Sequence, residues 1–328
     1  MNSVTFKCEV VTPMFLAGAN GNKPEFRPPS IKGALRFWWR AMHGNMNIEQ
    51  LRNEETRIFG GGGNDAERSK VNIRVSHPNL PLQGNLPTKK ISMPLRKYHD
   101  EYGEIHNVDL FKYLAYGAEK RKFIAIDIEF EITFTYDDRI SVNNDILNPF
   151  YALVFFGGLG AKCRNGFGSF RIKECSDKSI SLINDPAVFL RSLSPNFSFL
   201  SPCLYTAFSK DFSLFKTNNS KNTWSECLAV IGEAYAVERR KLEYVHHYDK
   251  RAYIATPIIQ SKTDWHTERH AKQYFLSITK NNNKYDGWIL FLPYKHRHDT
   301  VANAYKDVTD KLNIGLLTHY LTSVDVTT

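Results

Sequence analysis

A glycine-rich segment at residues 157–168 carries the residue types best suited to chemistry with phosphate. Five glycines and two cations stand within these twelve residues. The candidate contact residues of this segment are Gly157, Gly158, Gly160, Lys162, Arg164, Asn165, Gly166, Phe167 and Gly168. Glycine permits a positive φ and a close approach to the backbone, and backbone amides beside fixed cations suit phosphate groups. The segment therefore predicts a loop that lies against a phosphate-rich polymer.

This segment has one structural alternative, and two nucleotide-binding motifs are excluded for it. One or two glycines often end a helix, so a C-cap followed by a turn is the ordinary structural alternative. A nucleoside-triphosphate loop is excluded because no lysine with a hydroxyl neighbour stands in the required register. A dinucleotide fingerprint is excluded because Cys163 occupies the place of its third small residue.

A second candidate is the basic helix expected over Ser30–His43, with Ser30 as its N-cap. At about 100° per residue, Lys32, Arg36 and Arg40 fall within an arc of roughly 80°. The remaining positions are apolar and include two tryptophans, which we expect in the core. Solvated helix faces usually mix charge signs, so a stripe of cations alone favours an anionic partner over an ordinary polar face. We also expect free N–H groups at the start of the helix to suit a phosphate.

Composition limits the classes of function. The chain has 328 residues, a formal net charge of +9 and 42% hydrophobic residues. The length predicts two domains, and the charge indicates an acidic partner. No apolar run is long enough to span a membrane, and no signal peptide is visible at the N-terminus. We therefore expect a cytoplasmic protein without a membrane partner.

Cofactor and metal sites are not indicated by the sequence. The five cysteines form no C-x-x-C pair, so neither a disulfide framework nor a zinc site is expected. The histidine pair in 266–270 lacks the spacing of a zinc protease and is interpreted as part of a charged, solvated segment. We expect no cofactor and no metal.

The elements that position the two candidate motifs follow an order of strand, helix, strand, strand, helix, strand. Periodicity predicts strands or helices over Phe6–Val11, Ser30–His43, Glu49–Phe59, Val71–Val75, Asp109–Tyr116, Phe123–Thr135, Pro149–Phe156 and Ser169–Glu174. Residues 78–107 are expected to form an insertion with long loops. This order fits the split βαβ of a ferredoxin-like domain.

The second half repeats this order more loosely. We expect a helix over Trp224–Tyr244, strands over Ala252–Ile259, Gln273–Thr279 and Trp288–Pro293, and a helix over Val301–Leu312. The boundary is expected just after residue 174. The prediction is thus an α+β protein of two ferredoxin-like (RRM-like) βαββαβ domains with loop insertions, 1–175 and 176–328.

Both motifs resemble a known family. The segment Glu25–Arg40, with its Pro-Pro-Ser-Ile-Lys-Gly-Ala-Leu-Arg-Phe-Trp-Trp-Arg run, resembles the N-terminal motif of the first subunit of the type III-B CRISPR effector, the Cmr complex. Gly157–Gly168 resembles the glycine-rich loop of the wider RAMP superfamily. The resemblance implies ferredoxin-like domains and a non-catalytic place in a ribonucleoprotein. The implied partners are CRISPR RNA, target RNA and other Cmr subunits. The RNA contacts it implies are Lys32, Arg36, Arg40 and the loop.

Two other functions remain open at this point. An endoribonuclease would need a general base such as histidine, for which His43, His99 and His106 are candidates, or clustered aspartates near Asp127 and Asp137. A protein-assembly module would use the basic surfaces to bind acidic neighbours. Phe167 could either stack on a base or pack beneath its own loop.

Overall fold

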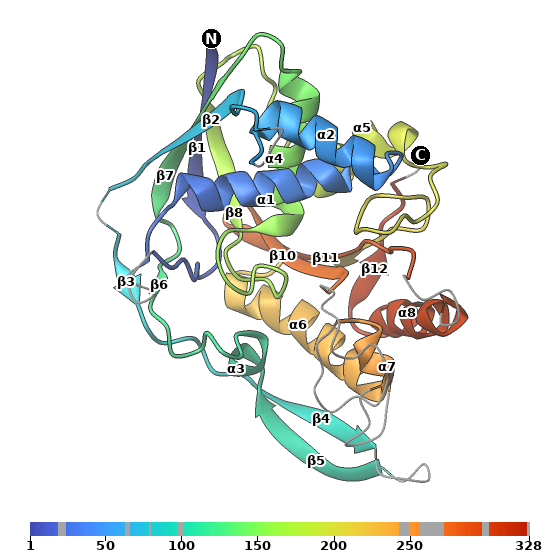
Figure 1. Ribbon diagram of the computed structural model, residues 1–328. Coiled ribbons are helices and arrows are strands. Elements are labelled where there is room, and N and C mark those ends of the chain that lie inside the picture. Colours follow the sequence, from blue (N-terminus) through green and yellow to red (C-terminus); the bar gives the residue numbers. More distant parts are fainter. Residues whose placement is uncertain are drawn as a thin grey trace.

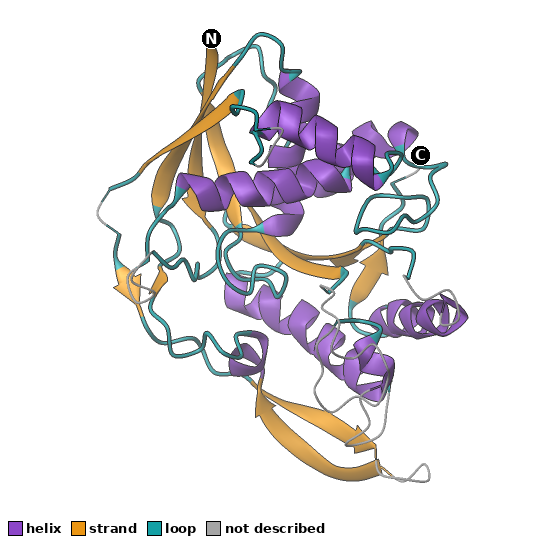
Figure 2. Ribbon diagram, viewed as in Figure 1, coloured by secondary structure: helices purple, strands orange, loops and turns teal. Residues whose placement is uncertain are grey.

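The first half of the chain is built on a four-stranded antiparallel sheet (Figures 1 and 2). A computed structural model describes residues 1–18, 24–62, 66–78, 80–96, 102–242, 249–255, 272–296 and 302–326. The strands run in the order β2-β7-β1-β8. Their bounds are β1 (Asn2–Val10), β2 (Val71–Ser76), β7 (Glu129–Tyr136) and β8 (Phe170–Cys175). Phe6 of β1 pairs with Ile132 of β7, and this register places the apolar side chains of both strands on one face.

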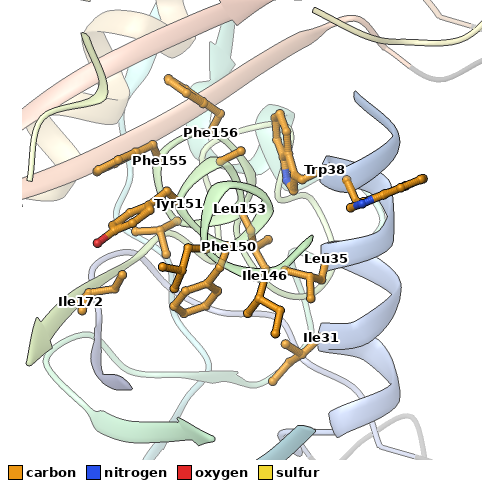
Figure 3. Packing of buried hydrophobic residues seen from close by; sticks show 14 of the residues in the cluster. Ile31, Leu35, Trp38, Ile146, Phe150, Tyr151, Leu153, Phe155, Phe156 and Ile172 are labelled. Carbon is orange, nitrogen blue, oxygen red and sulfur yellow. The ribbon is translucent and has the colours of Figure 1, made fainter. Parts of the chain in front are cut away.

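Helices cover that apolar face. They are α1 (Pro28–Ala41), α2 (Ile48–Phe59) and α4 (Asn148–Ala152), the last flanked by the π-helical turns η1 (Val142–Leu147) and η2 (Leu153–Gly157). Ile31, Leu35 and Trp38 of α1 face the α4–η2 segment, which contributes Phe150 and Leu153 (Figure 3). The helix expected over Pro149–Phe156 therefore exists as a buried, partly π-helical rod between β7 and β8.

A second antiparallel sheet occupies the second half, with strand order β10-β11-β9-β12. Its strands are β9 (Ser213–Thr217), β10 (Tyr274–Asn281), β11 (Lys284–Phe291) and β12 (Leu321–Ser323). The helices that follow β9 in this half are α6 (Trp224–Lys241), α7 (Asp249–Ala252) and α8 (Ala302–Leu316). In both four-stranded sheets, the first strand in sequence lies between the third and the fourth. The mixed α and β content with antiparallel sheets is as the sequence predicts.

The second sheet is buried on both faces. Tyr274, Leu276 and Ile289 belong to the core formed with α6 and α8, whereas Phe275 and Trp288 belong to the core formed with α1 and α4. The layers therefore run sheet, helices, sheet, helices, with β10 and β11 between α1 and α6 (Figure 1). An apolar core thus joins elements on either side of the expected boundary at residue 175.

The segment between β2 and β7 contains more structure than the expected loops. It forms the small sheet of β3 (Leu82–Gln83) with β6 (Phe123–Ile124) and the hairpin of β4 (Lys90–Arg96) with β5 (Tyr102–Asp109). The element expected over Asp109–Tyr116 is present as α3 (Leu110–Leu114). The single strand expected over Phe123–Thr135 is divided into β6 and β7. Asp127 adopts a positive φ of 62° between them, and this breaks the extended backbone that the alternation of apolar residues suggests.

Other boundaries also differ from the sequence prediction. α1 begins at Pro28 with Arg27 as N-cap, so Ser30 is not the cap; two prolines at the first helical positions are favourable because their φ is preset. Ala252, expected to start a strand, ends α7, and residues 256–259 of that predicted strand lie outside the described residues. The segment 176–222 contains α5 (Pro186–Leu193) and the short 3-10 turn η3 (Ser194–Asn196).

Candidate nucleic-acid interface

The cationic stripe of α1 exists, and α2 supplies part of its counter-charge. Arg36 Nε donates to Glu55 Oε1 at 2.6 Å, and Arg40 Nη1 donates to the same oxygen. Glu55 is 7% exposed, whereas both arginine side chains are 35% exposed. The stripe therefore combines a buried carboxylate with two arginines that remain partly open to solvent.

Lys32 completes the stripe without a carboxylate. Its Nζ donates to Ser69 Oγ, just before β2. Burial, followed by the neighbouring charge of Arg36, lowers the pKa of Lys32 below its usual value. Three cations therefore face one carboxylate, which leaves the stripe with a surplus of two positive charges.

The N-terminus of α1 does not offer the expected anion site. Pro28 and Pro29 have no N–H group, and the amides of Ser30 and Ile31 both donate to the carbonyl oxygen of Arg27 at 3.0 and 3.3 Å. The expectation of free N–H groups there is wrong, because the helix begins two residues earlier than the sequence pattern suggests.

The glycines of the 157–168 loop mainly allow the chain to pack against itself. Gly158, Gly160, Gly166 and Gly168 have φ values of 110°, 95°, 89° and 74°. A Cβ at Gly158 would lie 2.9 Å from the carbonyl oxygen of Gly168, and one at Gly160 would lie 2.5 Å from that of Phe15. These positions need glycine because neighbouring backbone occupies the space of a side chain.

Five of the twelve predicted contact residues are buried. They are Gly157, Gly158, Gly166, Phe167 and Gly168. Phe167 has no exposed surface and packs edge-to-face on Phe15, with ring centres 5.2 Å apart. The possibility that Phe167 stacks on a base is therefore wrong for this structure, and its alternative, packing beneath the loop, is confirmed.

Arg164 and Asn165 connect the loop to the second sheet. The guanidinium carbon of Arg164 lies 4.9 Å from the ring centre of Phe37 in α1 and 4.6 Å from that of Phe275 in β10. Leu276 N donates to the carbonyl oxygen of Arg164 at 3.2 Å, so the loop pairs with the outer edge of β10. Burial lowers the pKa of Arg164. This arginine therefore links the loop to α1 and β10.

Lys162 and Gly160 are the parts of the loop that face outward. Gly160 is exposed, and Lys162 is half-buried with a positive φ of 63°. The side chain of Lys162 has no hydrogen bond or ion pair within the described part of the chain. It is therefore the loop cation that remains available to an external anion.

The two motifs touch, but their cations point to different sides. Trp38 of α1 packs against Gly157, where a Cβ would lie 2.5 Å from the indole nitrogen, and Phe37 receives Arg164. Arg36 and Arg40 instead contact α2 through Glu55. The loop and the stripe thus flank α1 on separate faces of the helix.

Sequence reasoning did not identify Lys272, which lies behind the loop. Its Nζ donates to Asn165 Oδ1 at 2.7 Å and lies 4.2 Å from the ring centre of Tyr235. Burial, with the nearby charges of Arg239 and Arg164, holds the pKa of Lys272 well below its usual range. No sequence signal marks this lysine, because its surroundings come from α6 and the loop.

A second charged cluster ties the two sheets together. Lys280 of β10 donates to Glu9 of β1 at 2.9 Å and to Asp127 at 2.5 Å, and Arg171 of β8 donates to Glu9 at 3.1 Å. Burial opposes ionisation of Glu9, but hydrogen bonds from Arg171 and Lys280 outweigh it and lower the pKa of that carboxyl. These charges are paired with one another across the junction.

The candidate catalytic residues have structural partners. His43 Nδ1 donates to the carbonyl oxygen of Trp39 at 2.6 Å, and the two rings stack at 4.1 Å. Asp127 pairs with Lys280, and Asp137 forms a two-point ion pair with Arg139. His99 and the 266–270 histidines lie outside the described residues, as does the side chain of His106.

The described residues contain no group of three or more histidine, cysteine, aspartate or glutamate side chains placed to hold a metal ion. Their helices include none with the length and apolar character needed to cross a membrane.

Comparison with known proteins places these features in a family context. The model of the RAMP superfamily matches residues 7–171, about half of the chain, including both motifs. CRISPR system Cmr subunit Cmr1-2 of Pyrococcus furiosus is 30% identical over 193 residues, which cover 53% of this chain and 96% of the relative. Cmr1-1 of the same organism is 28% identical over 162 residues, covering 47% of this chain and 43% of the relative.

Solved structures share the fold across nearly the whole chain. The crystal structure of apo Cmr1 from Pyrococcus furiosus superposes with a TM-score of 0.61 at 18% identity, covering 98% of both chains. A chain of the type III-B Cmr-beta bound to cognate target RNA gives a TM-score of 0.53 at 14% identity, covering 94% of this chain and 99% of that one. The likeness therefore includes both four-stranded sheets.

Proposed function

We propose, since the chain belongs to the RAMP superfamily, that it is an RNA-binding subunit of a type III-B CRISPR effector, the Cmr complex. Its partners would be CRISPR RNA, target RNA and other Cmr subunits. The observation that carries this proposal is the α1 stripe, in which Lys32, Arg36 and Arg40 face the single carboxylate of Glu55. An excess of fixed positive charge on one rigid helix suits a polymer of phosphates.

The contacts are expected to go to phosphate and sugar. Base pairing supplies sequence specificity in RNA-guided complexes, so the protein needs little base readout. The proposed contact residues are Lys32, Arg36 and Arg40 of α1, with Gly160 and Lys162 of the loop. The other predicted loop residues support these contacts indirectly, because they hold the loop against α1 and β10.

A non-catalytic role is part of the same proposal. His43, which follows the end of α1, donates from Nδ1 to the carbonyl oxygen of Trp39. Asp127 and Asp137 are each held in an ion pair. General acid–base catalysis needs a group within hydrogen-bond reach of the reacting proton. The ion pairs hold both aspartates, and in His43 only Nε2 is left for such a role.

We further propose that each four-stranded sheet and its helices form a ferredoxin-like unit. The shared strand connectivity supports this division, with the boundary near residue 175. The cytoplasmic location expected from the sequence remains a prediction.

The stripe can be tested without leaving Glu55 unpaired. A variant carrying Lys32→Ala, Arg36→Gln, Arg40→Gln and Glu55→Gln is compared with Glu55→Gln alone, using fluorescence anisotropy of a labelled single-stranded RNA. The fourfold variant should lose at least tenfold in affinity, and the slope of log K against log salt should become shallower by about 2, at about 0.7 per phosphate contact. Equal affinity of the two variants would remove the stripe from the interface.

The same samples test the alternatives. RNA incubated with the protein in EDTA and in Mn²⁺ should remain intact on a denaturing gel. Cleavage that disappears in His43→Ala would replace the non-catalytic proposal with an endoribonuclease. RNA affinity that does not respond to salt would favour the protein-assembly module.

A further inference from the structure

The turn at residues 116–122, here called the basic turn, connects α3 to β6 and carries an unpaired cluster of charge. Lys120, Arg121 and Lys122 are consecutive and exposed. None of the three side chains forms a hydrogen bond or an ion pair within the described residues. The adjacent Glu119 offsets part of this charge, since backbone hydrogen bonds and then the charge of Lys120 lower the pKa of its carboxyl. Three neighbouring cations repel one another, so the arrangement favours an anionic ligand.

An exposed aromatic ring stands at the start of the basic turn. Tyr116 is 76% exposed, directly after the C-cap of α3. Gly117 follows with a positive φ of 81°, and a Cβ there would meet nothing within 4 Å. The backbone beside the ring is therefore open, and an open aromatic next to cations is what a splayed, single-stranded nucleotide requires.

Both ends of the basic turn are fixed to the glycine-rich loop and its neighbours. At the first end, Asn165 Nδ2 donates to the carbonyl oxygen of Leu114 at 2.7 Å. At the other end, the ring of Phe123 lies 5.4 Å from that of Phe15, whose carbonyl oxygen accepts from Ala161 N at 2.9 Å. The residues that flank the basic turn therefore contact the glycine-rich loop and its neighbour Phe15, and the turn runs between α3 and β6 (Figure 1).

We propose that the basic turn, together with Lys162, is a single-stranded RNA site in which Tyr116 stacks on an unpaired base and the cations bind flanking phosphates. This inference rests on the proposed RNA-binding function and extends the contact surface beyond both sequence motifs. The fixed ends hold the turn in position, so the ligand meets a surface that is largely formed in advance.

The charge contribution is tested with a matched pair of triple variants of the full chain. Lys120→Ala/Arg121→Ala/Lys122→Ala is compared with Lys178→Ala/Arg191→Ala/Lys210→Ala, which removes the same charges from exposed positions elsewhere. Binding of a fluorescein-labelled 16-nucleotide oligouridylate is measured at several salt concentrations. The first variant should bind at least tenfold more weakly and lose about 2 from its salt slope, while the control stays near wild type.

The stacking contribution has its own pair of variants. Tyr116→Ala should weaken binding of the single strand roughly tenfold, whereas Tyr116→Phe keeps the ring and should bind like wild type. Binding of an RNA duplex should change little in both, because its bases are already stacked. An equal loss for single strand and duplex would overturn the stacking role.

The outcomes separate this inference from the proposed function. If the wild type binds the RNA and both triple variants bind equally, the basic turn is not an RNA site, although the chain remains an RNA-binding protein. If the wild type itself does not bind the RNA, the proposed function and this inference both fail.

Discussion

At the scale of single residues, some glycines of this chain are required by the fold, whereas others only add flexibility to a helix. Substitution by alanine distinguishes the two kinds. Gly168 has a φ of 74°, and a Cβ there would overlap the carbonyl oxygen of Leu159. We expect Gly168→Ala to lower the free energy of unfolding by about 2 kcal/mol or more. Gly33 lies inside α1, and a Cβ there would meet nothing within 4 Å. Gly33→Ala should therefore raise the free energy of unfolding by about 0.5–1 kcal/mol. Urea unfolding of both variants checks this, and similar values for the two would contradict the assignment.

Substitutions of the two cations of the loop, Arg164 and Lys162, should also have different effects. Arg164 lies between Phe37 and Phe275, so Arg164→Ala should cost about 1–2 kcal/mol of stability through the lost ring contacts. The side chain of Lys162 has no hydrogen bond or ion pair in the described chain, so Lys162→Ala should leave the melting temperature unchanged and weaken RNA binding. Thermal melts paired with RNA titrations measure both effects. A destabilised Lys162→Ala would show that this lysine is structural too.

At the scale of elements, the ion pairs between β1, β8 and β10 make the junction sensitive to acid. The folded-state pKa of Glu9 lies below its usual 4.5. Its stabilising contribution is therefore complete above the pKa of the unfolded chain and is lost as pH falls through the lower folded value. We expect the stability difference between wild type and Glu9→Gln to shrink from pH 6 to about pH 3.

The measurement is the free energy of unfolding of wild type and Glu9→Gln at each pH across this range. Both proteins contain all the other carboxylates, so their difference reports on Glu9 alone. Lys280, whose other partner is Asp127, keeps one acidic contact in Glu9→Gln. A difference that does not depend on pH would mean that Glu9 is not ionised in the folded protein.

The sequence predicted elements best where a local signal marks their ends. α2 starts at a capping box of Asn47 and Gln50 and ends at Phe59, just before Gly60, whose φ is 80°. The expected helix also ends at Phe59. The strand over 123–135 was predicted too long because alternation continues through Ile126 and Ile128 while Asp127 turns the backbone. Alternation reports which faces are apolar, and a break made by a tertiary contact is invisible to it.

The candidate site was predictable only where it depends on spacing within one element. The spacing of Lys32, Arg36 and Arg40 placed them on one helix face, as observed. Their partner Glu55 lies on α2, and helical periodicity within α1 contains no information about that neighbour. Likewise, the roles of Phe167 and Arg164 depend on Phe15 and Phe275, which lie far away in sequence.

At the scale of the whole molecule, the second sheet is enclosed by helices of both halves. Phe275 and Trp288 pack in the same core as Trp38 of α1. We therefore expect the two halves to unfold together, in one transition seen alike by far-ultraviolet circular dichroism and tryptophan fluorescence. Two separated transitions would show that the halves are independent. In that case Phe275→Ala should shift only the transition of the half that contains β10.

The central claim is that the chain binds RNA through its phosphates. Its most direct test is the affinity of the full-length protein for labelled single-stranded RNA over a range of salt concentrations. At about −0.7 per contact, Lys32, Arg36, Arg40 and Lys162 predict a slope of log K against log salt near −3, and the basic turn extends it to about −5. A slope in this range, with the RNA intact, is the expected result; an affinity that does not change with salt would contradict the account.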